Sequence, residues 1–215
     1  SANDCQKIWS VFEQAFVGKD PCNVPTEAYD SLFNTVIQDH VCNRMMFWSK
    51  TSPLVHEFTK NCFQTLEDTL LGSIMNGLTW CSKEGSKEIF TTGCPLWNDC
   101  VNHTVKSFWH FASAAFADAA CGDVIAMLNG SIATPFTPTS IFATTEVKRF
   151  NATKMNSLTV VLVTKENDGK SCDDPSLHDL QKELDPRLKY NCKLVPVSQI
   201  HDCLSHHNTA CGACW

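Results

Sequence analysis

Two kinds of residue in this chain could do chemistry: neighbouring acids, and cysteines and histidines at short spacings. Glu67 and Asp68 are adjacent in the segment Thr65-Leu66-Glu67-Asp68. Paired carboxylates can act as acid and base or stabilise a developing cation. In the first turn of a helix, however, acids also serve simply to complement the helix dipole. Residue types alone therefore do not decide whether Glu67 and Asp68 form an acidic site or only stabilise the start of a helix.

The cysteines and histidines near the C-terminus resemble ligand and redox motifs without matching either. Cys203-x-x-His206 and Cys211-x-x-Cys214 are separated by only four residues, whereas zinc half-sites usually lie about 12 or more residues apart. Only Trp215 follows the Cys-x-x-Cys pair, so no helix begins there to lower a thiol pKa. We expect disulfides and no metal site.

The cysteine content and glycosylation sequons point to an oxidising compartment. The 215 residues include 13 cysteines, and Asn-x-Ser/Thr sequons begin at Asn102, Asn129 and Asn151. No apolar run is long enough to span a membrane, and no signal peptide is visible. A net charge of −6 without a basic stripe argues against a nucleic-acid partner. We expect an extracellular protein, here as a mature or trimmed ectodomain.

Helical periodicity dominates the first half of the chain. Asp4 can cap a helix that carries Ile8, Phe12 and Phe16 and ends before Gly18. Further helices are predicted after Thr26, with Leu32, Phe33, Val36 and Ile37 on one side, and from Thr65 to Leu78. Leu70, Leu71, Ile74, Met75 and Leu78 continue the period of that third helix. A fourth helix is predicted over residues 104–120.

The second half changes to short β-branched runs. Residues 124–128 and 158–163 read as buried strands, and Leu194-Val195 as a third. An amphipathic segment at 175–184, with Pro175 in its first turn, lies between the last two. Strand, helix and strand in this order predict a parallel crossover. The expected fold class is α/β, with a helical lobe beside a smaller lobe built on a parallel sheet.

Five segments in order resemble the ADP-ribosyl cyclase and NAD glycohydrolase family. They are Met46-Phe47-Trp48-Ser49; Thr65 to Gly72 continuing to Leu78-Thr79-Trp80-Cys81; Ser107-Phe108-Trp109 with Ala112-Ser113; Met127 to Ser131; and Phe142 to Val147. The resemblance implies one two-lobed, disulfide-rich domain over 1–215. Its helical lobe covers about 1–41 and 65–120, its α/β lobe about 42–64 and 121–215, and its active-site cleft lies between them.

The resemblance assigns site residues one by one. Glu146 matches the catalytic glutamate, although alone it would be interpreted as a surface acid. Glu67 and Asp68 match the acidic pair near the nicotinamide carboxamide. Of these two, Glu67 is the second residue with a catalytic assignment. The remaining substrate-binding positions are Trp48, Ser49, Lys50, Asn76, Trp109, Ser113 and Phe142.

The implied activity is cleavage of the nicotinamide–ribose bond of NAD or NADP, with no cofactor because the dinucleotide is the substrate. Glu146 would stabilise an oxocarbenium ion or trap it covalently. Ile141 replaces the threonine or aromatic residue of better-known relatives, so we expect mainly ADP-ribose and a little cyclic ADP-ribose. Asn76 stands where one relative has an acid, which puts base exchange in doubt.

Two other functions stay open: a receptor-like or adhesion ectodomain of the same fold, and a secreted glycosidase. The intact set of Trp48, Glu67, Trp109 and Glu146 argues against the first, and the paired indoles argue against the second. The product ratio, the preference between NAD and NADP, a membrane anchor outside this chain and a homodimer are not decided by the sequence.

The resemblance also implies a disulfide set. The pairs are Cys22–Cys100, Cys42–Cys121, Cys81–Cys94, Cys172–Cys192 and Cys203–Cys211. Cys5 matches a residue that pairs with an upstream cysteine in the family, and Cys62 and Cys214 have no counterpart. A Cys5–Cys62 bond is conceivable, with Cys214 free or intermolecular.

Overall fold

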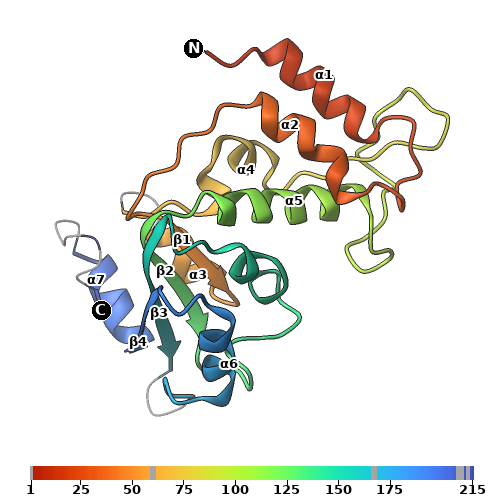
Figure 1. Ribbon diagram of the computed structural model, residues 1–215. Helices are drawn as coiled ribbons and strands as arrows, with labels where there is room; N and C mark the ends of the chain where they lie inside the picture. The colour runs from red at the N-terminus through yellow and green to blue at the C-terminus, as the bar shows by residue number, and fades with distance from the viewer. Residues whose placement is uncertain (1, 59–61, 166–168, 207–210, 212–213) are drawn as a thin grey trace. The chain divides into compact units, whose positions relative to one another are not determined.

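The computed structural model describes residues 2–58, 62–165, 169–206, 211 and 214–215, in two compact units. One unit comprises Ser1–Asp39 and Leu70–Ala115, and the other comprises His40–Thr69 and Phe116–Trp215. We call them the helical unit and the sheet unit (Figure 1). The mixed helix and strand fold expected from the sequence is confirmed.

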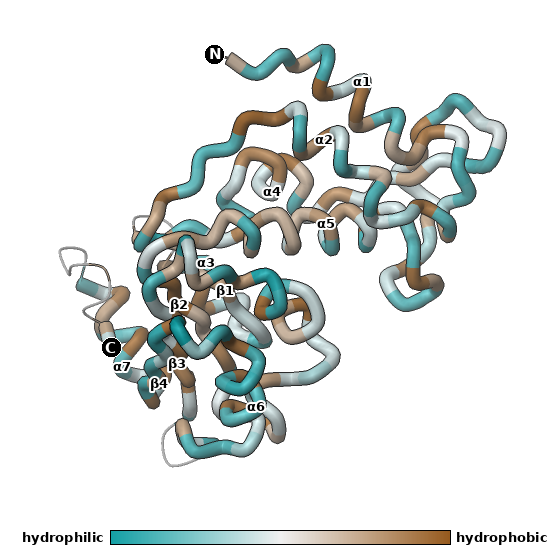
Figure 2. Tube along the Cα trace, viewed as in Figure 1, coloured by the Kyte–Doolittle hydropathy of each residue, from teal (hydrophilic) through white to brown (hydrophobic). Residues whose placement is uncertain are grey.

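The helical unit contains α1 (Cys5–Phe16), η1 (Thr26–Tyr29), α2 (Asp30–Thr35), α4 (Leu70–Met75) and most of α5 (Thr104–Asp118). Helix α1 starts as predicted, because the Asp4 carboxylate accepts from the backbone N–H groups of Gln6 and Lys7 at 3.1 and 3.2 Å. It ends before Gly18, whose φ of 80° suits glycine. Figure 2 shows α1 carrying both hydrophobic and hydrophilic residues, as an amphipathic helix should.

An aromatic cluster forms the interior of the helical unit. The Phe12 ring lies 5.7 Å from Trp80, and the Phe108 ring lies 5.4 Å from Trp80 and 5.5 Å from Tyr29. The buried Tyr29 hydroxyl donates to the Thr104 carbonyl at 2.9 Å and accepts from the Trp80 indole N–H at 3.1 Å. Both polar groups are therefore satisfied inside an apolar core.

The third predicted helix, over 65–78, is wrong as a single helix. The chain forms a 3-10 turn, η2 (Leu66–Asp68), leaves the helical conformation at Thr69 with ψ of 161°, and re-enters a helix as α4. The Thr69 hydroxyl donates back to the Leu66 carbonyl at 2.7 Å, and this local bond competes with the helical ladder. The predicted apolar face is also not buried as a whole. Met75 is buried, whereas Ile74 is 55% exposed.

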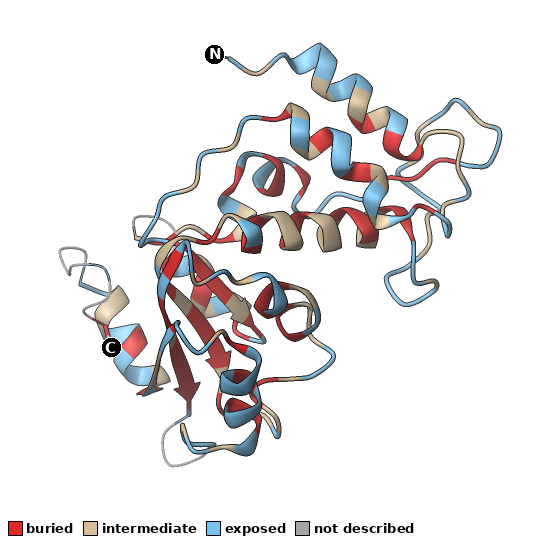
Figure 3. Cartoon of the chain, in the orientation of Figure 1, coloured by how far each residue is buried: buried red, intermediate tan, exposed pale blue. Residues whose placement is uncertain are grey.

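Four parallel strands, in the order β1-β2-β3-β4, form the sheet of the other unit. Strand β1 covers Met46–Ser49, β2 Gly122–Asn129, β3 Met155–Thr164 and β4 Lys189–Pro196. Helix α6 (Pro175–Glu183) connects β3 to β4, so the predicted crossover is confirmed. Figure 3 shows β2 and β3 buried, as expected for inner strands of a parallel sheet.

Strand alternation sends neighbouring residues into two cores. Leu158 and Leu162 pack on one face with Leu177 and Leu180 of α6. Val161 and Val163 pack on the opposite face, against α3 (Ser52–Phe58) and α7 (Val197–Leu204). Helices α3 and α7 were not predicted from the sequence. The sheet is therefore covered by helices on both faces.

Six disulfide bonds pair twelve of the thirteen cysteines, all of which lie in the described part of the chain. Four expected pairs are confirmed: Cys22–Cys100, Cys42–Cys121, Cys81–Cys94 and Cys172–Cys192.

The expected Cys203–Cys211 bond is wrong. Cys203 pairs with Cys214, and Cys211 pairs with Cys62. Cys5 is free and exposed, which also excludes the conceivable bond between Cys5 and Cys62. The error arose because Cys62 and Cys214 had no counterpart to guide their pairing, and spacing along the chain does not determine disulfide connectivity.

Candidate active site

Among the residues that the structure describes, Glu146 is the one buried acid, at 7% exposed. It ends η3 (Phe142–Glu146), a π-helical turn, and Val147 then begins a short 3-10 turn, η4 (Val147–Arg149). Such turns are rare and occur often at functional sites. The interpretation of Glu146 as an ordinary surface acid is therefore wrong, since the fold buries it.

Aromatic packing in the core holds the start of this turn in place. The Phe142 ring is 1% exposed and lies 6.4 Å from Phe47 of β1, 6.0 Å from Phe136 and 6.2 Å from Phe150. Phe142, which was predicted to bind substrate, therefore also packs in the core. With three aromatic neighbours, Phe142 fixes the start of the turn whose last residue is Glu146.

Glu67 and Trp48 join Glu146 in the sheet unit. The Trp48 indole N–H donates to the Glu67 carboxylate at 3.4 Å. Burial, and then the charge of Glu67, raise the pKa of Glu146 from its ordinary value of 4.5 to about 8. Two acids and an indole that are far apart in the sequence therefore form one electrostatically coupled group, which we call the acid–indole cluster.

His56 is a neighbour of this cluster that the sequence analysis missed. Its imidazole packs edge-on against the Trp48 indole, with ring centroids 5.8 Å apart. His56 lies on α3, a helix that was not predicted, so its approach to Trp48 had no signal in the sequence. Together with Glu67, it fixes the orientation of the indole.

Asp68 caps the start of the 3-10 turn η2. Its Oδ2 accepts from the Thr65 backbone N–H at 2.9 Å and from the Thr65 hydroxyl at 2.8 Å. This is the reciprocal contact of a capping box, with Asp in place of the usual Glu or Gln. Asp68 is exposed beside the half-buried Glu67, so the two neighbouring acids occupy different surroundings.

Ser49 and Lys50 follow Trp48 at the end of β1. Ser49 is buried, and Lys50 is exposed with a φ of 58°, a left-handed backbone conformation that is uncommon for a residue with a side chain. The other three expected substrate residues belong to the helical unit. There Trp109 is half-buried against Phe108, at a ring distance of 5.1 Å. Ser113 is buried and Asn76 is exposed.

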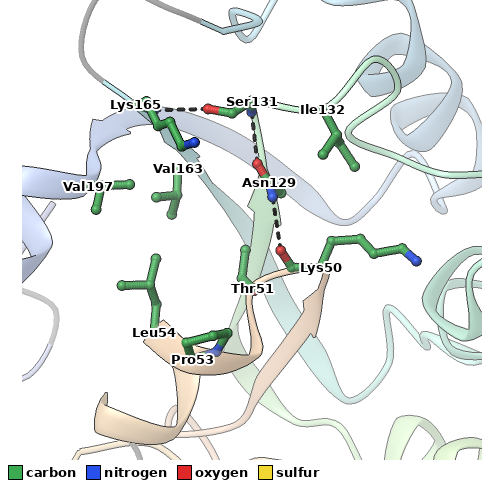
Figure 4. Close-up of a pocket in the computed structure, with 10 residues that line it drawn as sticks. All are labelled: Lys50, Thr51, Pro53, Leu54, Asn129, Ser131, Ile132, Val163, Lys165 and Val197. Carbon is green, nitrogen blue, oxygen red and sulfur yellow. Dashed lines mark hydrogen bonds between the residues drawn. The ribbon is translucent and has the colours of Figure 1, made fainter.

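A cavity of about 350 Å³ lies elsewhere in the sheet unit, and Lys50 is the one expected substrate-binding residue among those that line it (Figure 4). The acid–indole cluster is thus not part of this cavity. Across the described ranges, which omit 59–61, 166–168 and parts of the last nine residues, no three His, Cys, Asp or Glu side chains are grouped to hold a metal ion.

Comparison with known proteins identifies the family. The sequence profile of the ADP-ribosyl cyclase family matches residues 1–212. ADP-ribosyl cyclase/cyclic ADP-ribose hydrolase 1 of Rattus norvegicus is 38% identical over 189 residues, which is 86% of this chain and 62% of that protein. The Aplysia californica protein ADP-ribosyl cyclase/cyclic ADP-ribose hydrolase is 31% identical over 84% of this chain and 66% of its own length. The chain thus spans about three fifths of the mammalian relatives it matches, 62% and 60% for the rat and mouse proteins.

Solved structures agree with this match. Porcine CD38, determined with a covalent intermediate, superposes with a TM-score of 0.83 at 38% identity, over 90% of this chain and 86% of that one. An ADP-ribosyl cyclase bound to N1-cIDPR gives 0.85 at 27% identity, over 99% and 86%. The resemblance inferred from the five sequence segments is confirmed, and because the family profile covers nearly its whole length, this chain belongs to the ADP-ribosyl cyclase family.

Proposed function

We propose that the protein is an extracellular NAD glycohydrolase and ADP-ribosyl cyclase that cleaves the nicotinamide–ribose bond of NAD or NADP. The acid–indole cluster carries this proposal: a buried glutamate, Glu146, is coupled to Glu67, and Glu67 accepts from the indole of Trp48. The rat relative is named an ADP-ribosyl cyclase/cyclic ADP-ribose hydrolase, and porcine CD38 was determined with a covalent intermediate. The proposed chemistry uses no cofactor.

Glu146 acts on the sugar in this mechanism. The bond between the ribose anomeric carbon and the pyridine nitrogen breaks, and its electron pair leaves with neutral nicotinamide. The Glu146 carboxylate stabilises the oxocarbenium ion or forms an ester bond to the anomeric carbon. Water then attacks that carbon to give ADP-ribose, or the adenine ring of the same molecule attacks it to give cyclic ADP-ribose.

The high pKa of Glu146 fits a cationic substrate. Near neutral pH a carboxyl with a pKa of about 8 is largely protonated in the free protein. A positively charged pyridinium beside it favours the carboxylate, so substrate binding lowers this pKa and produces the reactive form. The enzyme thereby keeps an uncompensated charge out of its interior until the substrate supplies the counter-charge.

Glu67 serves as the second acid, because it holds the Trp48 indole through the N–H and adds negative charge near Glu146. An indole face attracts a pyridinium ring, which suits Trp48 to the nicotinamide. The resemblance alone assigns Asp68 to the carboxamide, and Ser49, Lys50, Asn76, Trp109, Ser113 and Phe142 to the rest of the substrate.

ADP-ribose is the expected main product. Ile141, which precedes η3, has an aliphatic side chain that neither donates a hydrogen bond nor stacks on adenine. Water therefore competes well with the adenine ring for the intermediate. Substitution of Ile141 by Phe should increase the cyclic fraction, measured as the ratio of cyclic to linear product by chromatography.

The deciding experiment measures nicotinamide release from NAD and from nicotinamide guanine dinucleotide. Glu146→Gln should lower kcat by a factor on the order of 10³ or more, the scale for losing a group that stabilises developing charge. Glu183→Gln, at an exposed position of α6, is the matched control. A folded wild-type protein that releases no nicotinamide would refute the enzyme and leave a receptor-like ectodomain.

Extracellular residence is supported by the six disulfides, since such bonds persist in oxidising compartments. Within the described residues, none of the helices combines the length and the apolar character needed to cross a bilayer. Intact-mass measurement of the secreted protein before and after reduction should show a gain of twelve hydrogens for the six bonds.

A further inference from the structure

The 350 Å³ cavity lies where the parallel strands of the sheet unit end. Asn129 ends β2, Val163 is near the end of β3, and Val197 begins α7. Hydrocarbon side chains supply much of the wall, with polar groups at a few points. The full lining is Lys50, Thr51, Pro53, Leu54, Asn129, Ser131, Ile132, Val163, Lys165 and Val197. Its volume is at the lower end of the range for small-molecule sites, about 300–1,000 Å³.

Asn129 is both a lining residue and the first residue of a sequon, Asn129-Gly130-Ser131. Its Oδ1 accepts from the Ser131 backbone N–H at 2.9 Å, and its Nδ2 donates to the Lys50 carbonyl at 3.0 Å (Figure 4). An amide nitrogen carries two hydrogens. One serves the Lys50 carbonyl, and the other can be replaced by a sugar without breaking that bond.

The other two sequons lie in different surroundings. Asn102 is exposed at an isolated bridge with Asn23. Asn151 is exposed, and its Oδ1 accepts from the backbone N–H and the hydroxyl of Thr153, both at 2.8 Å. Neither residue lines the cavity at Asn129. The chain therefore contains its own controls for any effect of a glycan that depends on the cavity.

We propose that the first N-acetylglucosamine of an N-linked glycan on Asn129 packs into this cavity. The acetyl methyl and the C–H face of the sugar would cover Leu54, Ile132 and Val163 and remove apolar surface from water. The bound sugar would also hold the Asn129 amide, and with it the left-handed Lys50, in a single conformation. The glycan thus becomes part of the packing of the sheet unit.

Attachment follows ordinary glycosyl transfer from a polyprenyl diphosphate-linked oligosaccharide. The Asn129 amide nitrogen forms a bond to the anomeric carbon of the sugar and loses one proton. The bond from that carbon to the diphosphate oxygen breaks, and the lipid diphosphate leaves with the electron pair. The inference rests on the proposed passage through a glycosylating compartment but not on NAD cleavage. The nicotinamide assay tests NAD cleavage alone, so its failure would leave the glycan proposal standing.

The test is site-resolved deglycosylation of the folded glycoprotein, secreted from cells that make high-mannose glycans. Peptide N-glycosidase in ¹⁸O-water marks each released site by mass, because it converts Asn to Asp. Asn129 should be released more slowly than Asn102 and Asn151, by on the order of tenfold or more, since the enzyme must wait for local opening. Equal rates at the three sites, or an unmodified Asn129, would overturn the proposal.

A second measurement isolates the first sugar. Endoglycosidase H cleaves after the first N-acetylglucosamine and leaves it attached, so Tm should stay unchanged. Complete removal by peptide N-glycosidase should lower Tm by several degrees, whereas prior loss of the Asn102 and Asn151 glycans through Gln substitutions should not. If endoglycosidase H lowers Tm as much as complete removal does, the cavity does not hold the first sugar.

Leu54→Ala removes one wall of the cavity and should bring the release rate at Asn129 close to that of the other sites. Leu96→Ala, at a residue that is 73% exposed in the helical unit, is the matched control and should change nothing. Val197→Ala provides a second wall variant if Leu54→Ala does not fold. Continued slow release in a folded wall variant would contradict the packing of the sugar against this surface.

Discussion

Glu146→Gln should make the protein more stable at the same time as it removes activity. Burial holds the pKa of Glu146 near 8, whereas the same side chain in the unfolded chain titrates near 4.5. Between these values the unfolded state gives up its proton and the folded state keeps it. Stability of the wild type therefore falls as the pH rises through this window, because the folded state binds more protons there.

The size of this loss follows from the pKa difference. The pKa rises from 4.5 to about 8, and each pH unit between these values corresponds to about 1.4 kcal/mol, so the penalty approaches about 5 kcal/mol above pH 8. Below about pH 4.5 both states are protonated and the penalty vanishes. A glutamine at position 146 has a similar shape and no charge to bury, so its stability carries no such dependence.

The assay is equilibrium unfolding in guanidinium chloride at pH 5, 6, 7, 8 and 9, with all disulfides intact. The difference in unfolding free energy between Glu146→Gln and wild type should grow by up to about 1.4 kcal/mol per pH unit from pH 5 to 8 and then level off. Titrating groups that are not coupled to Glu146 cancel in the difference. Glu183→Gln should show no such growth. If the unfolding free energies of Glu146→Gln and wild type change in parallel with pH, Glu146 does not have the raised pKa that its burial implies.

Four further predictions concern the acid–indole cluster and the Cys62–Cys211 bond. kcat/KM for NAD should rise tenfold per pH unit below about pH 8 and then reach a plateau, because the Glu146 carboxylate is the active form; a flat profile from pH 5 to 9 would contradict this. Glu67→Gln removes a like charge, so the rising limb should move to lower pH in the same assay. Trp48→Phe loses the N–H donated to Glu67 but keeps a ring, so KM should rise with little change in Tm, measured by steady-state kinetics and thermal unfolding. Replacing Cys62 and Cys211 together by Ser opens a bond that spans 149 residues and should cost a few kcal/mol in guanidinium unfolding; no change would show that the bond is not formed.

The sequence predicted those elements whose pattern is local. Asp4 and the i, i+4 apolar residues determine α1, and the run at 158–163 has the composition of a buried strand. The third helix was wrong because the hydroxyl of Thr69 bonds to the Leu66 carbonyl, and periodicity takes no account of such a side-chain contact.

The candidate site could not be derived from pattern at all. Glu146 looks like a surface acid in the sequence, whereas the turn that it ends packs through Phe142 against Phe47, a residue about 95 positions earlier in the chain. The contact of Trp48 with Glu67 likewise joins residues from different elements. Resemblance to a family supplied these residues. The resemblance also implied one wrong pair, Cys203–Cys211, because it gave no counterpart for Cys62 and Cys214, which take those two cysteines as partners.

The pairing of β1 with β2 has a consequence for biosynthesis. Met46 pairs with Ile125, and Leu70–Ala115 of the helical unit lies between them in the chain. At a synthesis rate of about 5–20 residues per second, several seconds pass between the synthesis of the apolar strand β1 and the synthesis of β2. During that time its edge has no partner strand within the chain and is open to pairing with other chains. The Cys42–Cys121 bond closes beside the completed pair and makes the late register permanent.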